Sequence, residues 1–353
     1  MPITAELWQA NLLALIVAFV SIKVLRPIAI YFNLVDVPSG RKQHTGHIPL
    51  IGGLSVYIGV LVAILAMFPI HDKLFYLLTA ASLILISGLV DDLKDLGVWV
   101  RILIMMLASV IMIKGTGVYV DDIGNILGSG NLQIGLLGIP FTIIAVIGLV
   151  NAINMSDGID GLTGSLALVA IIGIIGFETI SGNYRLFDFL LIMAAALIPY
   201  LLTNLTIISR RKIFLGDAGS MFIGFVLAWV LIELSQGHGT SRQAIQPVNV
   251  IWCVAVPVID TLAVIIKRLK SGRSPFSPDR SHFHHVLLDK GYKSRQALLI
   301  ILLLALVVIA VGWVVELYAP LVALPALILM ALAYMYWVRH NGWNHGVTNQ
   351  QRN

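Results

Sequence analysis

The stretch N-A-I-N-M-S-D-G-I-D-G, residues 151–161, closes one long apolar run of the sequence and opens the next. On a helix, Asn151, Asn154 and Asp157 would share one face, which Asp160 would continue. The two glycines would let a ligand approach the backbone closely. The alternative is a polar turn between two membrane helices, with Asp160 capping the second. Acids at a membrane boundary are usually functional, so we favour a ligand site, and amides beside acids suit a nucleotide better than a lipid tail.

The composition is that of an integral membrane protein. Hydrophobic residues make up 58% of the 353 residues and charged residues 12%, where soluble domains carry about 25% charged residues. We therefore expect an all-α polytopic bundle forming a single domain over residues 1–353. The net charge of +5 does not indicate nucleic-acid binding, because the basic residues are segregated by side. Cys253 is the only cysteine, which excludes an internal disulfide and a cysteine metal site.

About eleven apolar runs are long enough, or nearly so, to cross a bilayer. They lie near residues 7–27, 50–69, 74–90, 98–113, 135–153, 161–180, 186–208, 216–235, 248–267, 297–315 and 320–338. An odd number of spans puts the two termini on opposite sides. Of the 23 lysines and arginines, one side receives only Lys73, Lys114, Arg185 and Arg242. The positive-inside rule makes the other side the cytoplasm, so we expect the N-terminus outside and the C-terminus in the cytoplasm.

Carboxylates gather on this predicted cytoplasmic side. The loops near 31–49, 91–97, 154–160, 209–216 and 268–296 and the adjoining span ends carry Asp36, Asp91, Asp92, Asp95, Asp157, Asp160, Asp217, Asp279 and Asp289. Most lysines and arginines lie on the same side. A magnesium–phosphate site needs both kinds of charge, because acids hold the metal while cations hold the phosphoryl oxygens. The convergence of these loops predicts an active site at the cytoplasmic surface.

A basic, glycine-containing loop, G-R-K-Q-H-T-G-H-I-P-L-I-G-G, enters the second apolar run at residues 40–53. Arg41, Lys42 and His44 could meet a phosphate at the membrane surface. A positive-inside anchor with glycines packed between helices explains the same residues equally well. This loop alone leaves both interpretations open.

The run D-D-L-K-D at residues 91–95 follows the third apolar run, with Arg101 beyond it. On a helix Asp91 and Asp95 are four residues apart and Asp92 and Asp95 three apart, so at least two carboxylates share a face. Crowded carboxylates ionise together only when a cation neutralises them. The alternative, an acidic solvated loop, is less favourable beside an anionic membrane surface. We therefore favour a functional site.

The stretch F-L-G-D-A-G-S, residues 214–220, opens the eighth run after Arg210-Arg211-Lys212. Asp217 is a good helix N-cap and the glycines would ease helix packing, which is the structural interpretation. As a further acid at the same membrane level, Asp217 could instead complete the ligand shell of a hard cation.

Asp260 differs from these acids because it lies inside the ninth run, after Pro257. A carboxylate buried there is costly and needs a partner. We expect Lys267 or Arg268, two turns further along the same face, to supply that partner. We interpret Asp260 as structural support for the site.

The longest predicted cytoplasmic loop contains S-P-F-S-P-D-R-S-H-F-H-H, residues 274–285. Its three histidines raise the question of zinc, but H-x-H-H contains no i,i+4 pair and Asp279 is the only neighbouring acid. A cluster of Arg280, His282, His284 and His285 that binds phosphate or sugar hydroxyls fits a basic loop better. The alternative is a solvated basic loop, which would not require its two prolines.

Together and in this order, these stretches resemble the motifs of the polyprenyl-phosphate N-acetylhexosamine-1-phosphate transferases. The resemblance runs from about residue 36 to 295 and rests on R-K-Q-H-x-G-x-I-P-L-x-G-G, D-D-x-x-D, N-x-x-N-M-x-D-G-x-D-G-L, G-D-x-G-S and S-P-F-S-P-D-R-x-H-x-H-H. The last motif resembles the branch that transfers N-acetylglucosamine 1-phosphate (GlcNAc-1-phosphate) to undecaprenyl phosphate. The branch that uses UDP-MurNAc-pentapeptide typically has three consecutive histidines, from which H-F-H-H departs.

The resemblance implies that UDP-GlcNAc and undecaprenyl phosphate react to give GlcNAc-diphosphate-undecaprenol and UMP. This would be the first step of O-antigen or enterobacterial-common-antigen type synthesis at the bacterial inner membrane, with Mg²⁺ as cofactor and Mn²⁺ as a substitute. The implied roles are metal binding for Asp217 and Asn154; catalysis for Asp91, Asp92 and Asp157; and substrate binding for Asp160 (uracil), Asn151, Arg101 (phosphate), Lys42, His44, Arg280, His282, His284 and His285 (diphosphate and sugar). A homodimer is left open.

The sequence leaves two rival functions open. A transporter would place its charged residues near the bilayer midplane between repeated halves, whereas these acids lie at span ends and no internal repeat is evident. Within the family, another UDP-N-acetyl sugar or UDP-MurNAc-pentapeptide could be the donor.

Overall fold

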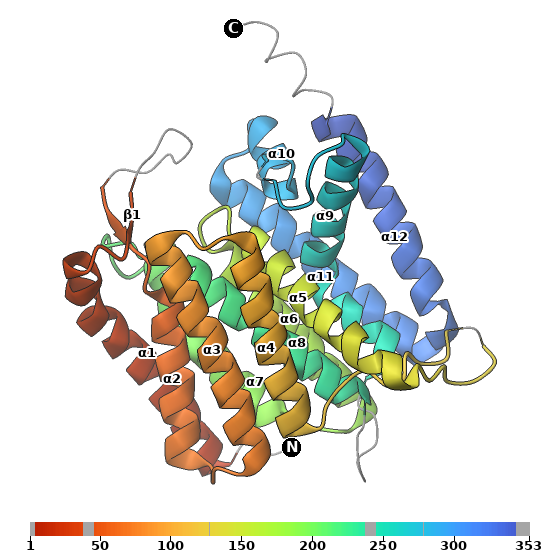
Figure 1. Ribbon diagram of the computed structural model, residues 1–353, viewed down its shortest axis with the longest axis horizontal. Coiled ribbons are helices and arrows are strands. Elements are labelled where there is room, and N and C mark those ends of the chain that lie inside the picture. The colour runs from red at the N-terminus through yellow and green to blue at the C-terminus, as the bar shows by residue number, and fades with distance from the viewer. Residues whose placement is uncertain (1–3, 38–45, 127, 237–244, 278, 344–353) are drawn as a thin grey trace, which may run out of the picture.

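The computed structural model describes residues 4–37, 46–126, 128–236, 245–277 and 279–343. Every predicted apolar run forms a helix, and the chain is an α-helical bundle, as predicted (Figure 1). These helices are α1 (Ala5–Tyr31), α2 (Gly52–Met67), α3 (Asp72–Lys94), α4 (Val98–Thr116), α5 (Gly138–Met155), α6 (Leu162–Ser181), α7 (Phe187–Asn204), α8 (Gly216–Gln236), α9 (Val250–Lys270), α11 (Ser294–Tyr318) and α12 (Ala323–Val338).

Within the described ranges, ten helices are long and apolar enough to cross a membrane. The exception among the predicted runs is α2, whose 16 residues span about 24 Å, less than the roughly 30 Å hydrocarbon core. Helix α12 is equally short by itself, but adjoining helical turns lengthen it to the 22 residues Pro320–Asn341. The count of eleven apolar helices is therefore confirmed, while ten of them reach spanning length. One further helix, α10 (Phe283–Asp289), and the two-residue strands β1 (Val35–Asp36) and β2 (Ile48–Pro49) lie in the loops.

The helices alternate in direction, so the polar motifs meet at one end of the bundle. The C-terminal ends of α3, α5, α7 and α9 lie there with the N-terminal ends of α4, α6, α8 and α11. In Figure 1, α1 begins at the opposite end, and α12 ends beside α10. We call the end that carries the motifs the site end and the opposite one the far end.

Helix α8 is the centre of the bundle, and 89% of its most apolar 18-residue stretch is buried. Small residues let its neighbours approach closely. A Cβ added to Gly53 of α2 would lie 2.0 Å from Gly219 Cα, and one added to Gly88 of α3 would lie 2.4 Å from Ala218 Cα. Such close contacts between small residues are how membrane helices pack. The packing role considered for the G-D-A-G-S glycines is thus confirmed for Gly219.

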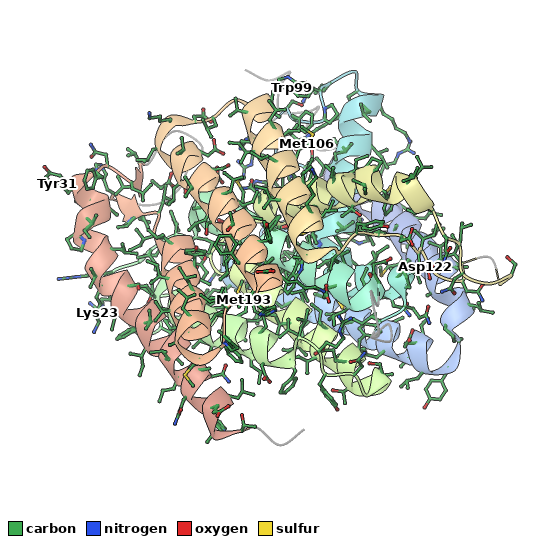
Figure 2. The ribbon with its side chains drawn as sticks, turned by 60° about the horizontal axis from the view of Figure 1, so that its bottom comes forward. Lys23, Tyr31, Trp99, Met106, Asp122 and Met193 are labelled. Atoms are coloured by element: carbon green, nitrogen blue, oxygen red, sulfur yellow. The ribbon has the colours of Figure 1, made fainter. Side chains whose placement is uncertain are left out.

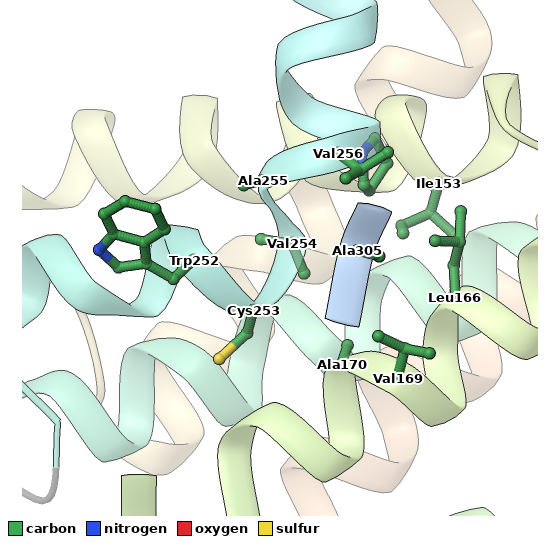
Figure 3. Close-up of a pocket in the computed structure, with 11 residues that line it drawn as sticks. Ile153, Leu166, Val169, Ala170, Trp252, Cys253, Val254, Ala255, Val256 and Ala305 are labelled. Carbon is green, nitrogen blue, oxygen red and sulfur yellow. The ribbon is translucent and has the colours of Figure 1, made fainter. Parts of the chain in front are cut away.

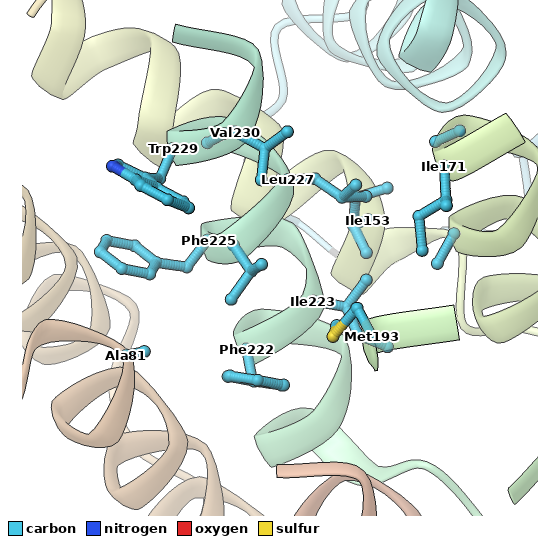
Figure 4. Packing of buried hydrophobic residues seen from close by; sticks show 14 of the residues in the cluster. Ala81, Ile153, Ile171, Met193, Phe222, Ile223, Phe225, Leu227, Trp229 and Val230 are labelled. Atoms are coloured by element: carbon cyan, nitrogen blue, oxygen red, sulfur yellow. The ribbon is translucent and has the colours of Figure 1, made fainter. Parts of the chain in front are cut away.

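The core around α8 is continuous and apolar. Figure 4 shows Phe222, Ile223 and Phe225 of α8 surrounded by neighbouring helices, with Ala81 of α3 and Ile153 of α5 close by. All five are fully buried or nearly so. This packing fixes the direction in which α8 presents its N-terminus to the site end.

The outer helices carry apolar side chains on their exposed faces. In α1, α4, α11 and α12 only 17–33% of the most apolar 18-residue stretch is buried. Figure 2 shows Tyr31 and Trp99 at the outside of the molecule, and both are largely exposed. Lipid tails solvate such faces, as expected for helices in a bilayer.

Helix α9 is broken at Val254, which has φ −127° and ψ 18°. Pro257 explains the break, because its ring clashes with the carbonyl of Cys253 four residues earlier. Figure 3 shows a small buried pocket at this point, between α9 and apolar residues such as Leu166 and Ala305. Irregular backbone at membrane depth is tolerated where protein surrounds it. The half of α9 beyond the break carries Asp260. It leads into residues 274–285, which we call the histidine segment.

Candidate active site

The G-D-A-G-S turn is attached to the end of the basic loop by backbone hydrogen bonds. Phe214 N donates to Pro49 O at 2.9 Å, Gly52 N donates to Phe214 O at 2.9 Å, and Gly53 N donates to Leu215 O at 2.9 Å. Two segments more than 160 residues apart therefore meet at the start of α8. Lys42 and His44, predicted substrate contacts in the basic loop, lie outside the described residues.

Asp92 caps helix α8. Its carboxylate accepts hydrogen bonds from Asp217 N at 2.9 Å and Ala218 N at 3.2 Å, two of the backbone donors that a helix N-terminus leaves unpaired. Gly216 precedes them with φ +77°, and a Cβ there would lie 2.6 Å from Asp92 Oδ2. Glycine is therefore required at 216 on both grounds. The interpretation that Asp217 caps its own helix is wrong, because Asp92 from α3 fills that position.

Asp91 is buried beside Asp92, and both of its carboxylate oxygens accept hydrogen bonds. Arg101 Nη1 donates to Asp91 Oδ2 at 2.8 Å, and Leu96 N donates to Asp91 Oδ1 at 2.6 Å. A buried carboxylate needs such a partner, because removing it from water is costly. Arg101, predicted to contact phosphate, thus neutralises Asp91 in this structure, and its contact with phosphate stays a prediction. Asp95 is exposed.

Asp217 is held by an amide. Asn154 Nδ2 donates to Asp217 Oδ1 at 3.0 Å and to Ser220 Oγ at 3.0 Å. Asp217 also interacts electrostatically with Asp91 and Asp92. Three carboxylates and one amide from α3, α5 and α8 therefore converge at the site end.

Asn151 lies one turn before Asn154 on α5, but its amide is used differently. Asn151 Nδ2 donates to Ile147 O at 2.7 Å and to Met105 Sδ at 3.6 Å. Helix α5 ends at Met155, so the predicted helical face holds Asn151 and Asn154 but not Asp157 or Asp160. The two hydrogen bonds join Asn151 to its own helix and to α4. Its predicted contact with substrate is not tested by the structure.

The convergent cluster suits a hard cation. Across the described ranges, no three histidine, cysteine, aspartate or glutamate side chains form a ready metal site. Mg²⁺ does not need one, because proteins usually bind it through one or two carboxylates together with substrate phosphates and water. Asp217, whose hydrogen-bond partner is a neutral amide, and the amide oxygen of Asn154 are ligands of the kind that Mg²⁺ prefers.

The second half of residues 151–161 meets a cation. Lys212 Nζ pairs with Asp160 Oδ2, and the same ammonium lies 5.1 Å from the centre of the Phe214 ring. Arg26 Nη1 donates to Lys212 O at 3.2 Å and to Arg211 O at 2.8 Å, so α1 supports this segment. Lys212 was not among the predicted site residues, although the basic run before G-D-A-G-S was the signal that could have identified it.

Asp157 lies at the surface between Asn154 and Asp160. The residue is exposed, while the protein atoms that surround its carboxyl group partly desolvate it and raise its pKa to about 7. The negative charges of Asp217 and Asp160 act in the same direction. A carboxyl group that titrates near neutrality is suited to exchanging a proton with a phosphate.

Asp260 receives three hydrogen bonds, none of them from the expected partners. His282 Nδ1 lies 2.8 Å from Asp260 Oδ2, while Phe283 N and Tyr334 Oη donate to Asp260 Oδ1 at 3.0 and 2.6 Å. The prediction that Lys267 or Arg268 pairs with Asp260 is wrong. Two turns of helix separate these residues by about 10 Å along the axis, whereas the returning loop brings His282 into contact.

The expected basic partners bind the loop instead. Arg268 Nε and Nη2 donate to the two carboxylate oxygens of Asp279, each at 3.2 Å. Burial alone would raise the pKa of Asp279, but these hydrogen bonds and the positive charge of Arg268 outweigh it and hold the pKa below its usual value. Lys267 Nζ donates to Ser281 Oγ. These contacts hold the histidine segment against the end of α9.

The histidine segment contacts residues 151–161, the predicted nucleotide-binding stretch, through His284. Its ring lies parallel to that of His282, with centres 6.0 Å apart. A Cβ added to Gly158 would lie 2.0 Å from His284 Nε2. The first glycine of D-G-I-D-G therefore makes room for a histidine that is more than a hundred residues away in sequence.

Electrostatics keep His284 neutral. Burial, together with the neighbouring basic side chains of His285, His282 and Arg280, lowers its pKa to about 2. In the described part of the chain, His284 Nε2 and His285 Nδ1 are buried without a hydrogen-bond partner. Arg280 is exposed and lies 3.7 Å from Asp289. Buried, unpaired ring nitrogens beside a surface arginine are suited to a polar ligand.

A membrane bundle with carboxylates, amides and histidines gathered at one end fits a membrane glycosyl transferase, and the comparisons with known proteins agree. Residues 74–235, from α3 to α8, match the model of glycosyl transferase family 4. The chain also resembles proteins named undecaprenyl-phosphate alpha-N-acetylglucosaminyl 1-phosphate transferase. The relative from Yersinia pestis is 38% identical over 323 residues, 90% of this chain and 87% of its own.

Two other relatives of the same name support this assignment. That from Escherichia coli O157:H7 is 36% identical over 315 residues, 88% of this chain and 84% of its own. That from Haemophilus influenzae is 37% identical over 303 residues, 85% and 84% of the two chains. The chain belongs to the polyprenyl-phosphate N-acetylhexosamine-1-phosphate transferase family, as its motifs predicted.

Proposed function

We propose that this protein transfers GlcNAc-1-phosphate from UDP-GlcNAc to undecaprenyl phosphate, forming GlcNAc-diphosphate-undecaprenol and UMP. The observation that carries the proposal is the similarity to relatives of that name over 90% of the chain. The geometry supports it, because Asp91, Asp92, Asn154 and Asp217 lie together at the end of the bundle where the histidine segment also lies. We place the enzyme in the bacterial inner membrane.

We propose Mg²⁺, with Mn²⁺ as a substitute, as the cofactor, held by Asp217 and Asn154. When bound, the metal would neutralise the diphosphate and stabilise charge as the phosphoryl group moves. Asp92 holds Asp217 N and Ala218 N, and so orients the first turn of α8. Arg101 limits the charge of the cluster by neutralising Asp91.

We propose that Asp160 and Lys212 bind the nucleotide and that Arg280, His284 and His285 bind the diphosphate and sugar. Asp160 and Lys212 pair with each other in this structure, so a bound nucleotide would exchange that pair for contacts of its own. The unpaired nitrogens of His284 and His285 would form hydrogen bonds with hydroxyl or amide groups of the sugar.

The lipid phosphate attacks the sugar-linked phosphorus directly in this proposal. A phosphate monoester has a second pKa near 6, so it is largely dianionic at pH 7 and already carries a competent nucleophile. An aspartyl-phosphate intermediate would need Asp91 or Asp92 as a free nucleophile. Asp91 is bound by Arg101 and Leu96 N, and Asp92 by two backbone amides. Both carboxylates are therefore better suited to orientation than to attack.

An exchange experiment separates the two routes. A covalent intermediate would let the enzyme incorporate labelled UMP into UDP-GlcNAc without lipid, and direct attack would not. We expect no exchange from rigorously delipidated enzyme. Exchange near the rate of turnover that Asp91→Asn or Asp92→Asn abolishes would refute direct attack.

We propose that the site end faces the cytoplasm and the N-terminus lies outside. The positive-inside rule supports this orientation, because Arg211, Lys212, Arg268 and Arg280 lie at the site end. The test places a cysteine at Ser277 after Cys253→Ala and treats intact cells with an impermeant thiol reagent. We expect no labelling until the cells are opened, and ready labelling from outside would overturn the orientation.

The test of the function itself is UMP release by the purified protein from a panel of UDP-sugars and UDP-MurNAc-pentapeptide. We expect release from UDP-GlcNAc only when undecaprenyl phosphate is present. Release from another UDP-N-acetyl sugar alone would change the donor and keep the reaction. The transporter alternative predicts no release from any donor, so the same assay excludes it or favours it.

A further inference from the structure

Asp260 is a buried carboxylate inside a membrane-spanning helix, and it lies outside the part of the chain that the family model covers. It is 6% exposed and lies beyond residues 74–235. Ionisable groups at such positions are expensive and usually functional. Its three partners come from the histidine segment and from α12, so a single side chain joins three elements at the site end.

The chemistry of these contacts determines which nitrogen of His282 faces outward. An ionised carboxylate only accepts hydrogen bonds, so the 2.8 Å contact with Asp260 Oδ2 requires a proton on His282 Nδ1. Nε2 is then the ring nitrogen left for a ligand. Phe283 N and Tyr334 Oη both donate to Oδ1, which leaves Oδ2 directed at the histidine.

Tyr334 contributes more than its hydroxyl group. Its ring meets Phe283 edge to face, with centres 5.6 Å apart and planes at 83°. The residue that follows His282 is therefore held by an aromatic contact and by a backbone hydrogen bond to Asp260. Both fix the rotation of the backbone that carries the His282 ring.

The orientation of the His282 ring affects residues 151–161, because His284 lies between them. It stacks on His284 with planes at 4°, and His284 packs against Gly158, between Asp157 and Asp160. A displaced His282 would leave the parallel stack and remove one wall of the space that His284 occupies.

We propose that Asp260 and Tyr334 are positioning residues for the donor: they keep His282 Nδ1 protonated and the ring oriented, so that Nε2 faces the diphosphate-sugar. The proposal deepens the function proposed above and rests on it. It assigns no direct substrate contact to Asp260 or Tyr334, and it gives α12 a role in donor binding.

The first test is the tautomer of His282, read by ¹⁵N NMR of histidine-labelled protein in detergent, with the resonance assigned by its loss in His282→Gln. We expect Nδ1–H in the wild-type protein. In Asp260→Asn the amide NH₂ would face Nδ1, while the amide oxygen could still accept from Phe283 N and Tyr334 Oη. We expect this variant to carry the proton on Nε2. The readout needs no turnover, so it does not depend on the proposed reaction.

The second test is kinetic and uses the donor identified by the panel of UDP-sugars. We expect Asp260→Asn to lower kcat/KM for the donor by about 10- to 100-fold, by analogy with the loss when a metal-binding histidine loses its carboxylate partner. The KM for undecaprenyl phosphate should stay unchanged. Tyr334→Phe keeps the aromatic contact and loses one hydrogen bond, so we expect a smaller loss of about 2- to 10-fold.

The matched control is Glu178→Gln. Glu178 is a fully buried carboxylate in α6 that accepts a hydrogen bond from Leu186 N at 2.9 Å at the far end of the bundle. We expect an unchanged His282 tautomer and unchanged donor kinetics. An effect there equal to that of Asp260→Asn would mean that any buried charge acts through stability alone, and would overturn the proposal.

Two further outcomes would also overturn it: Nε2–H in the wild-type protein, or wild-type donor kinetics in Asp260→Asn. If Asp260→Asn does not fold, the wild-type tautomer and the kinetics of Tyr334→Phe decide. Nδ1–H with a loss confined to the donor supports the proposal, and any other combination refutes it.

Discussion

The two ends of the bundle both contain carboxylates withdrawn from water, but they use them differently. At the far end Glu233 and Glu178 each have a local partner: Arg185 pairs with Glu233, and Glu178 accepts from Leu186 N. At the site end Asp91, Asp92 and Asp217 come from two helices and repel one another. Isolated pairs fasten loops, whereas crowded carboxylates store negative charge that a substrate or cation can use.

The largest effect should come from the crowded end. We expect Asp217→Asn to lower turnover by about 100- to 1,000-fold, the loss typical of removing one group that stabilises transition-state charge, while the protein still inserts and folds. The matched variant Glu233→Gln, an acid of the same helix at the far end, should keep its turnover. Initial rates of UMP release measure both.

Metal removal tests the same cluster without a mutation. Excess EDTA should abolish UMP release, and added Mg²⁺ or Mn²⁺ should restore it, because the cluster has carboxylates and amides but no cysteine ligands. Full activity in EDTA would refute the metal proposal and leave the family assignment intact.

The next effect should come from the contact between the histidine segment and D-G-I-D-G. In Gly158→Ala the new Cβ would lie 2.0 Å from His284 Nε2, so His284 must move. We expect the donor KM to rise about 10-fold or more, with little change in the KM for undecaprenyl phosphate. Gly148→Ala is the control, because nothing lies within 4 Å of its added Cβ. Equal behaviour of the two variants would contradict the contact.

A smaller loss is expected at the nucleotide pair. Asp160→Ala removes the partner of Lys212 and should weaken UMP binding by about 10-fold, in the range of hydrogen bonds to charged groups. Binding of undecaprenyl phosphate should not change. Separate titrations of the two ligands by calorimetry measure the difference, and an unchanged UMP affinity would count against Asp160 as a nucleotide contact.

The smallest effect should appear at the far end. Arg185→Gln breaks the pair with Glu233, whose side chains are 20% and 12% exposed. Because a pair of this kind closes a loop and stands apart from the carboxylate cluster, we expect a slightly lower Tm and unchanged kcat. A large loss of turnover would show that the two ends are coupled and would remove the contrast between them.

Sequence alone determined the class of fold and the family. Apolar length predicts helices directly, because a bilayer leaves the backbone no other hydrogen-bonded structure, and all eleven runs became helices. Alternating direction then places the acids of separate loops at one end. The motifs, taken as a set, identified the family that the relatives confirm.

Only the tertiary structure decided which groups pair. Asp92 caps a helix that begins 124 residues later, Asp260 binds His282 rather than Lys267, and Gly158 makes room for His284. Residue types and spacing describe neighbours within about two turns, whereas these pairs depend on how helices distant in sequence pack around α8. The sequence therefore predicts that charged groups will meet. The close packing of small residues such as Gly53 and Gly219 determines which of them do.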